Sequence, residues 1–132
     1  MAAPVLGFIG FGEAASSIAE GLRSEGLADI RAFDAGMDHP SLGPQIRERA
    51  GRLGVELKSN LEELIASCDL IINATNAKAA EAVAREAARF LRPHQLYVDL
   101  NSASPMTKES IAALIAGSGA PFVDAAVMDS VP

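Results

Sequence analysis

The sequence predicts a three-layer α/β fold, in which a parallel β-sheet lies between two layers of helices. Short apolar runs of strand length alternate along the chain with segments whose apolar residues recur at helical spacing. This alternation is typical of consecutive βαβ units. The 132 residues, of which 49% are hydrophobic, are enough to bury one core and too few for two. We therefore expect one domain over residues 1–132.

The first half of the chain contains three expected strands and two helices that connect them. The strands are Val5–Ile9, Ile30–Phe33 and Val55–Leu57. Ala14, Ile18 and Leu22 form one apolar face at helical spacing, which predicts a helix after the first strand. A second helix is expected over Pro44–Leu53 and ends at Gly54, because glycine readily adopts the left-handed conformation of a C-terminal cap.

The second half repeats the pattern with three more strands. These are Leu70–Ile72, Leu96–Leu100 and Phe122–Val127. Ser59 and Glu62 have the spacing of a capping box, which predicts a short helix ahead of the fourth strand. Residues 80–91 have helical spacing, and we expect Pro93 to stop this helix because proline cannot continue it.

The last helix has clear end signals. Ser104 can cap its N-terminus, Pro105 suits the first helical position, and Gly117 marks its end. Six strands with helical crossovers match a Rossmann-type, doubly wound parallel sheet with strand order 3-2-1-4-5-6. In this fold a ligand binds at the carboxyl ends of the strands.

Composition excludes several classes of function. The formal net charge is -6 and the eleven Lys and Arg residues are scattered, so we expect no nucleic-acid partner. Cys68 is the single cysteine, which excludes an internal disulfide and leaves no cysteine-rich metal site. No apolar run approaches the roughly 18 residues of a membrane span, and no signal peptide precedes Val5. We expect a cytoplasmic protein without a membrane partner or a bound metal.

A glycine-rich segment joins the first strand to the first helix. Its residues are Gly10, Phe11, Gly12, Glu13, Ala14 and Ala15, which fit the pattern G-x-G-x-x-G/A of dinucleotide-binding proteins. Gly10 permits a tight turn, Gly12 lets the backbone approach a pyrophosphate, and Ala15 keeps the helix close to the sheet. The helix N-terminus offers free amides to the phosphates. The alternative is a glycine-rich turn without a ligand.

Asp34 closes the second strand, 22 residues after Gly12, near the offset of the carboxylate that binds the adenosine ribose. A carboxylate accepts hydrogen bonds from two hydroxyls but repels a 2′-phosphate, so the sequence favours NAD over NADP as the cofactor. Two alternatives stay open. Asp34 could cap a loop without binding the ribose, and Asp38 is a competing acid for the ribose role. Arg31 and Arg47 are the cations that could compensate for a 2′-phosphate.

Three blocks resemble the β-hydroxyacid dehydrogenases, the family of 3-hydroxyisobutyrate and 6-phosphogluconate dehydrogenases. They are residues 7–12 (GFIGFG), residues 99–105 (DLNSASP) and residues 122–127 (FVDAAV). The first block alone would also suit pyrroline-carboxylate reductases. The resemblance implies an oxidoreductase that transfers hydride between a nicotinamide cofactor and a small hydroxy acid or related carbonyl compound. The alternative is a non-catalytic module that senses the dinucleotide.

The resemblance also implies roles for residues after the fourth and fifth strands. Ala74, Thr75 and Asn76 would contact the cofactor. Asn101 and Ser102 would lie near the nicotinamide and the substrate. Asn101 stands where the family usually has serine, and its amide can still donate to a substrate carboxylate or hydroxyl.

The segment after the sixth strand departs from the family. Met128, Asp129 and Ser130 stand on the substrate side where relatives usually have Ser-Gly-Gly, which leaves the substrate open. The general acid/base of the family is a lysine in a later helix, and no residue of this chain is assigned that catalytic role. We expect a helical domain for substrate binding and dimerisation after residue 132, and a homodimer for the full-length protein.

Overall fold

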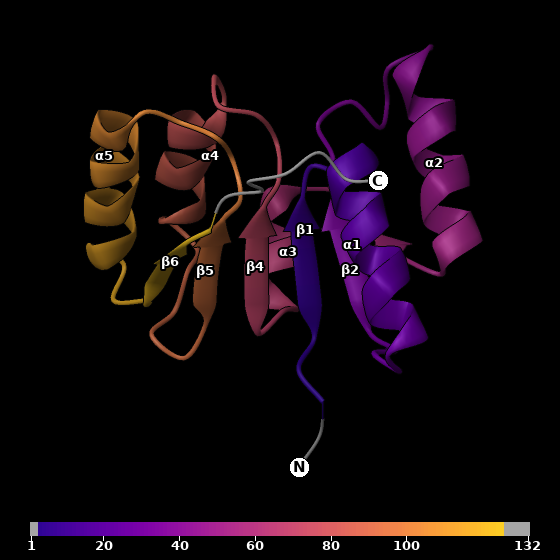
Figure 1. The fold of residues 1–132 in the computed structure, drawn as a ribbon, viewed down its shortest axis with the longest axis horizontal. Coiled ribbons are helices and arrows are strands. Elements are labelled where there is room, and N and C mark those ends of the chain that lie inside the picture. Colours follow the sequence, from indigo (N-terminus) through magenta and orange to yellow (C-terminus); the bar gives the residue numbers. More distant parts are fainter. Residues whose placement is uncertain (1–2, 126–132) are drawn as a thin grey trace.

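The computed structural model describes residues 3–125, which form a six-stranded parallel sheet with the order β3-β2-β1-β4-β5-β6 (Figure 1). The strands are β1 (Leu6–Ile9), β2 (Ile30–Phe33), β3 (Glu56–Leu57), β4 (Leu70–Asn73), β5 (Leu96–Asp99) and β6 (Phe122–Asp124). Each pair of neighbouring strands in this sheet is parallel, which requires a crossover between them. The Rossmann-type fold and its strand order are therefore confirmed.

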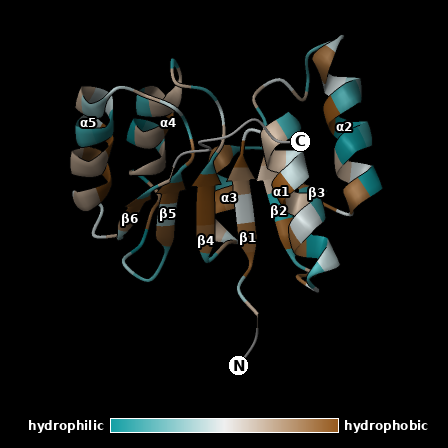
Figure 2. Cartoon of the chain, viewed as in Figure 1, coloured by the Kyte–Doolittle hydropathy of each residue, from teal (hydrophilic) through white to brown (hydrophobic). Residues whose placement is uncertain are grey.

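Within residues 3–125, five helices cover the two faces of the sheet. They are α1 (Glu13–Ser24), α2 (Leu42–Leu53), α3 (Leu61–Ala66), α4 (Ala80–Ala87) and α5 (Pro105–Ala116). One core cluster joins the sheet to α1 and α2, and a second joins it to α3, α4 and α5. Figure 2 shows apolar central strands, with much of the outer surface of α2 hydrophilic. Both faces of the sheet are therefore packed, as expected for parallel strands that read as continuous apolar runs.

Gly7 in the central strand β1 allows a neighbouring segment to approach closely. A Cβ at this position would lie 2.6 Å from Cys68 Sγ and 3.2 Å from Leu64 Cδ1. Cys68 itself is buried within the core cluster that contains α3. Glycine at this position therefore fixes the distance between β1 and the turn that joins α3 to β4.

The predicted helix ends at Gly54, Ser104 and Gly117 are confirmed, and the predicted cap at Ser59 is wrong. Gly54 has the left-handed φ of 68° at the end of α2, and Ser104 Oγ accepts a hydrogen bond from Thr107 N at the start of α5. The cap of α3 is Asn60, whose side chain accepts a hydrogen bond from Glu63 N, and not Ser59. Asn60 has an extended backbone (φ -155°, ψ 169°), so it lies outside the helix, and the buried Leu61 is the first helical residue.

The fourth helix is shorter than predicted, because α4 ends at Ala87 and does not continue to Pro93. The amides of Arg89 and Phe90 donate to carbonyls three residues earlier, at 3.1 and 2.9 Å. This tightened turn brings Leu91 into the core, where it is buried. The apolar spacing of residues 80–91 thus reflects burial and does not mark a continuous α-helix. The predicted strand end at Val127 lies outside the described residues.

Within residues 3–125, none of the helices is long and apolar enough to cross a membrane.

Candidate functional site

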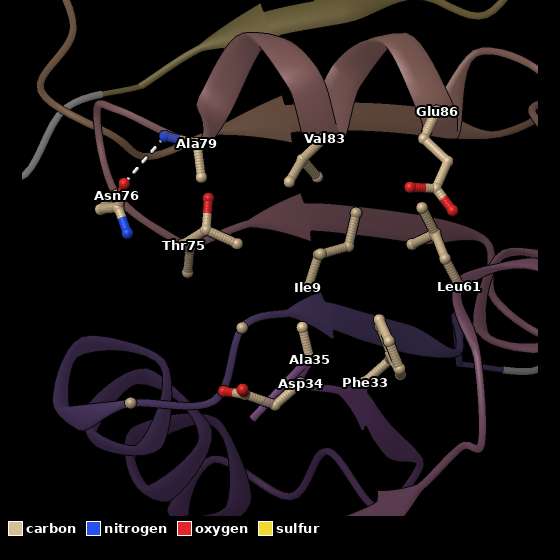
Figure 3. Close-up of a pocket in the computed structure, with 13 residues that line it drawn as sticks. Ile9, Phe33, Asp34, Ala35, Leu61, Thr75, Asn76, Ala79, Val83 and Glu86 are labelled. Carbon is tan, nitrogen blue, oxygen red and sulfur yellow. Dashed lines mark hydrogen bonds between the residues drawn. The ribbon is translucent and has the colours of Figure 1, made fainter. Parts of the chain in front are cut away.

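A cavity of about 390 Å³ lies at the carboxyl ends of β1, β2 and β4 (Figure 3). The cofactor residues predicted from the sequence that line it are Gly10, Gly12, Asp34, Ala74, Thr75 and Asn76. Leu61 from α3 and Val83 and Glu86 from α4 extend the cavity away from the glycine-rich loop. The strand order changes direction between β1 and β4, and ligands of doubly wound sheets bind at this switch point.

Gly10 is required by the fold itself. Its φ of +86° lies in the region that favours glycine, and a Cβ would lie 2.8 Å from the carbonyl oxygen of Ala74. The amide of Gly10 donates to Phe33 O at 2.8 Å. This residue therefore joins the loop to the ends of β2 and β4.

Gly12 differs from Gly10, because a Cβ there would meet no heavy atom of the described chain within 4 Å. It is the N-cap of α1, has a negative φ of -89° and provides no side-chain cap. Among the described residues, the amides of Gly12, Glu13, Ala14 and Ala15 have no hydrogen-bond acceptor, whereas Ser16 N donates to Gly12 O. These amides and the positive end of the helix dipole can bind an anion.

The loop between the two glycines is held on both sides. Phe11 is fully buried, and its ring packs against Phe8 with centroids 6.1 Å apart. Arg49 Nη1 donates to Phe11 O at 3.1 Å, and Phe11 N donates to Asp34 Oδ2 at 2.8 Å. The position of the loop is therefore fixed by α2, β2 and the core together.

Asp34 borders the cavity and also organises the loops around it. Its Oδ2 accepts from Phe11 N and its Oδ1 from Gly36 N, both at 2.8 Å. Each carboxylate oxygen keeps a further lone pair for a ligand hydroxyl. The competing acid Asp38 is exposed and forms an ion pair with Arg47 at 3.1 Å, and neither residue lines the cavity.

Asn73, at the end of β4, is a buried polar residue that sequence reasoning missed. Its Oδ1 accepts hydrogen bonds from Thr75 N and Thr75 Oγ1, at 3.2 and 2.7 Å. Its Nδ2 donates to Tyr97 Oη at 2.9 Å and to Ala80 O at 3.4 Å. Burial raises the pKa of the Tyr97 hydroxyl, which therefore stays neutral. The signal in the sequence was one amide that ends an otherwise apolar strand.

Asn76 and the residues after β5 have different surroundings. Asn76 Oδ1 accepts from Ala79 N at 2.8 Å, which caps the turn before α4 (Figure 3). Asn101 is 7% exposed, and its Nδ2 donates to Asn73 O and Asn73 Oδ1 at 3.3 and 3.0 Å. The nitrogen expected to donate to a substrate, Nδ2, thus donates to Asn73 in this structure. Ser102 is exposed. The predicted substrate-side residues Met128, Asp129 and Ser130 lie outside the described residues.

An ion-pair cluster joins β5, β6 and α5 beside these residues. Lys108 Nζ lies 3.2 Å from Oδ1 of the fully buried Asp99 and also pairs with Asp124. Asp99 Oδ1 accepts from Asn101 N at 2.7 Å as well, which shapes the turn after β5. The second carboxylate oxygen, Oδ2, is the buried side-chain atom without a partner in the described part of the chain. The cluster anchors the turn that carries Asn101.

Several known proteins are similar to this chain in sequence or in fold. Residues 5–103 match the family model described as NADP oxidoreductase, coenzyme F420-dependent. Pyrroline-5-carboxylate reductase from Pseudomonas aeruginosa is 32% identical over 107 residues, which cover 80% of this chain and 37% of that protein. The crystal structure of a conserved hypothetical protein from Sinorhizobium meliloti has 40% sequence identity and a TM-score of 0.88, over 97% of this chain and 42% of that one.

A third relative supports the resemblance predicted from the sequence. It is a conserved protein of unknown function whose structure is described as similar to 3-hydroxyacid dehydrogenases, with 39% identity and a TM-score of 0.79. The match covers 96% of this chain and 44% of that chain. This chain therefore spans less than half the length of these three relatives.

These matches favour an oxidoreductase domain over the alternative of a non-catalytic sensing module, because the matched family and the named relative are oxidoreductases. The matched segment includes the glycine-rich loop, Asp34 and the polar residues at the ends of β4 and β5, which border or adjoin the cavity. The chain belongs to the family described as NADP oxidoreductase, coenzyme F420-dependent, as an NAD(P)-binding domain.

Proposed function

We propose that the cavity binds a nicotinamide dinucleotide, with the pyrophosphate at the N-terminus of α1. The observation that carries this proposal is the space at Gly12. The fold does not need glycine there, because a Cβ would meet nothing within 4 Å and φ is negative. The space adjoins the helix amides that have no acceptor among the described residues, which suits a phosphate group.

The remaining lining residues suit the adenosine half of the cofactor. Asp34 accepts hydrogen bonds from the ribose hydroxyls through the lone pairs that Phe11 N and Gly36 N leave free. Leu61 and Val83 provide apolar walls for the adenine ring. The nicotinamide ring, when bound, supplies or accepts the hydride.

Within this proposal the cofactor is NAD, and NADP is the second candidate. The carboxylate of Asp34 borders the cavity and repels a 2′-phosphate. Arg47 is engaged by Asp38, and Arg31 pairs with Asp29 and Glu56. The description of the matched family names NADP and so supports the second candidate. The ratio of the affinities for NADH and NADPH therefore tests directly which cofactor the site prefers.

We propose hydride transfer to or from a small substrate at a carbon bonded to oxygen or nitrogen. A hydroxy acid or the corresponding carbonyl is the form that the three sequence blocks favour, and the pyrroline-carboxylate reductase relative supports the nitrogen form. The general acid/base would come from a helical domain that follows this one, in a cytoplasmic homodimer. Asn101 and Ser102 lie on the substrate side in this scheme.

Alanine substitutions at Gly12 and Gly10 test cofactor binding. Gly12→Ala is expected to leave the melting temperature unchanged and to weaken NADH binding at least about tenfold, because the methyl group occupies the phosphate position. Gly10→Ala is expected to lower both stability and binding, since its φ of +86° and Ala74 O oppose a Cβ. Fluorescence titration and thermal unfolding are the measurements. Unchanged NADH affinity in folded Gly12→Ala would remove the phosphate site from this loop.

A further inference from the structure

The buried polar network behind the cavity connects the carboxyl ends of β4 and β5. Asn73 and Tyr97 are fully buried, and Asn101 is 7% exposed. Thr75, which lines the cavity, and Asn101 both donate to the same oxygen, Asn73 Oδ1, at 2.7 and 3.0 Å. Asn101 therefore lies one hydrogen-bonded atom away from the cavity wall.

Backbone groups that cannot change their polarity fix the direction of each amide in this network. The amide of Thr75 can only donate, and the carbonyl of Ala80 can only accept. Asn73 must therefore direct Oδ1 towards Thr75 and Nδ2 towards Ala80. Asn101 consequently faces two acceptors, Asn73 O and Asn73 Oδ1, and must present Nδ2 to them. The flipped amide would bring three oxygens together without a shared proton.

The side-chain oxygen of Asn101, Oδ1, is therefore the atom that remains for a ligand. Within residues 3–125 it accepts no hydrogen bond, whereas Nδ2 has its acceptors on Asn73. An amide held in this way selects a ligand group that donates, and it disfavours a carboxylate at the same point. This polarity is opposite to the donor role expected of Asn101 from the sequence.

The sheet order indicates which part of the cofactor lies near Asn101. In the proposed function, the pyrophosphate lies at the end of β1 and the adenosine half extends towards Asp34 at the end of β2. β4 and β5 lie on the other side of β1, so the nicotinamide half extends over their carboxyl ends. Asn101 follows β5 by two residues.

We propose that Asn101 Oδ1 accepts a hydrogen bond from the carboxamide N–H of the nicotinamide ring, and that Asn73 is the residue that sets its orientation. The inference rests on the proposed function. It assigns to Asn101 a role in distinguishing the carboxamide from groups of similar shape that lack a donor. Asn73 is a positioning residue and does not touch the cofactor.

A comparison of two cofactors tests this assignment on the full chain. The probes are NADH and the reduced dinucleotide that carries an acetyl group in place of the carboxamide, which keeps the carbonyl and removes the N–H donors. The wild type is expected to bind NADH up to about tenfold more tightly, the range of one net hydrogen bond. Asn101→Ala is expected to bring the ratio of the two affinities close to one.

Asn101→Ala should fold, because Asn73 O still accepts a hydrogen bond from Leu100 N, and Asn73 Oδ1 still accepts hydrogen bonds from Thr75. Thermal unfolding verifies this. Ser118→Ala is the control. It removes a hydrogen-bonding side chain in the loop before β6, which lies at the amino ends of the strands and therefore away from Asn101. This control is expected to keep the wild-type ratio.

ADP-ribose, which lacks the nicotinamide, separates the two proposals. Its affinity is expected to be equal in the wild type and Asn101→Ala. If the wild type binds ADP-ribose and NADH but shows no preference over the acetyl analogue, or if folded Asn101→Ala keeps the preference, the role of Asn101 is wrong and the cofactor site stands. If the wild type binds none of the three probes, the proposed function itself is wrong.

Discussion

Asp34 holds the loops around the cavity and lines the cavity itself. It caps the loops through Phe11 N and Gly36 N. A substitution that removes the whole side chain therefore disturbs the glycine-rich loop as well as any contact with a ribose. The neutral isostere asparagine changes the charge with the smallest change in shape.

Asp34→Asn is expected to narrow the preference for NADH over NADPH. The wild type should bind NADH about ten- to a hundredfold more tightly, because a phosphate near the carboxylate is repelled. Removing the charge relieves that repulsion while Oδ1 still accepts one loop hydrogen bond. Parallel fluorescence titrations with both cofactors provide the measurement. Equal affinities in the wild type would show that Asp34 is not at the ribose.

Lys108 stabilises a carboxylate that has no access to solvent. Asp99 is fully buried and the Lys108 side chain is 12% exposed, so removing the cation leaves a buried charge unpaired. We expect Lys108→Met to lower the free energy of unfolding by about 3–5 kcal/mol. Asp99→Asn in the same chain should recover part of this loss. Urea denaturation of the single and double variants measures both, and independent, additive effects would contradict the pairing.

The packing of β1 against the α3–β4 turn depends on the absence of a side chain at Gly7. Gly7→Ala is expected to destabilise the fold by about 1–3 kcal/mol, because the new Cβ would overlap Cys68 Sγ. Cys68→Ala in the same chain removes that sulfur and should restore part of the stability. Thermal or urea unfolding of the three variants measures the coupling.

Gly21→Ala is the matched control for this substitution. Gly21 lies inside α1, its φ is not positive, and a Cβ at this position would have no heavy atom within 4 Å. Alanine should therefore stabilise the helix by about 0.5–1 kcal/mol. A similar gain from Gly7→Ala would show that the close approach does not constrain β1.

The elements were predictable where one local signal decides the structure. The apolar runs of β1, β2, β4 and β5 and the caps at Gly54 and Ser104 are properties of adjacent residues. The cap of α3 was misplaced because Ser59 and Asn60 are both residue types that cap helices well, and local sequence does not choose between them. The end of α4 was misplaced because burial of Leu91 produces helical spacing without a helix.

The candidate site was predictable from sequence up to its polar network. Gly10, Gly12 and Asp34 belong to a motif with fixed spacing, and the structure brings them to one cavity. The pairing of Asn73 with Asn101 depends on which strands are neighbours, and it determines which atom of the amide is available. Residue type alone gives no information on that polarity, since an amide both donates and accepts.

The buried hydroxyl of Tyr97 and the buried thiol of Cys68 make the stability of the fold sensitive to high pH. Burial raises the pKa of Cys68 and of Tyr97 above their ordinary values of 9.0 and 10.0. Above those values the unfolded chain loses protons that the folded chain retains, so the free energy of unfolding falls as pH rises. Well below pH 9.0 both groups are neutral in either state and contribute no slope.

We expect the free energy of unfolding to decrease from about pH 9 upwards, and Tyr97→Phe to flatten the part of the decrease above pH 10. The variant should be less stable at neutral pH, because Asn73 Nδ2 loses its bond to Tyr97 Oη. Urea denaturation at a series of pH values measures both effects. An identical alkaline slope in the variant would exclude Tyr97 as its source.

The fixed position of Phe11 affects the entropy of ligand binding. Its ring is buried and its amide and carbonyl are both hydrogen-bonded, so contacts within the fold itself hold the glycine-rich loop in place. Ordering a flexible loop opposes association, and a loop that is ordered in advance avoids most of that loss. More of the favourable free energy of contact between an anion and α1 then contributes to affinity, because the loop is ordered when the chain folds and not when the ligand binds.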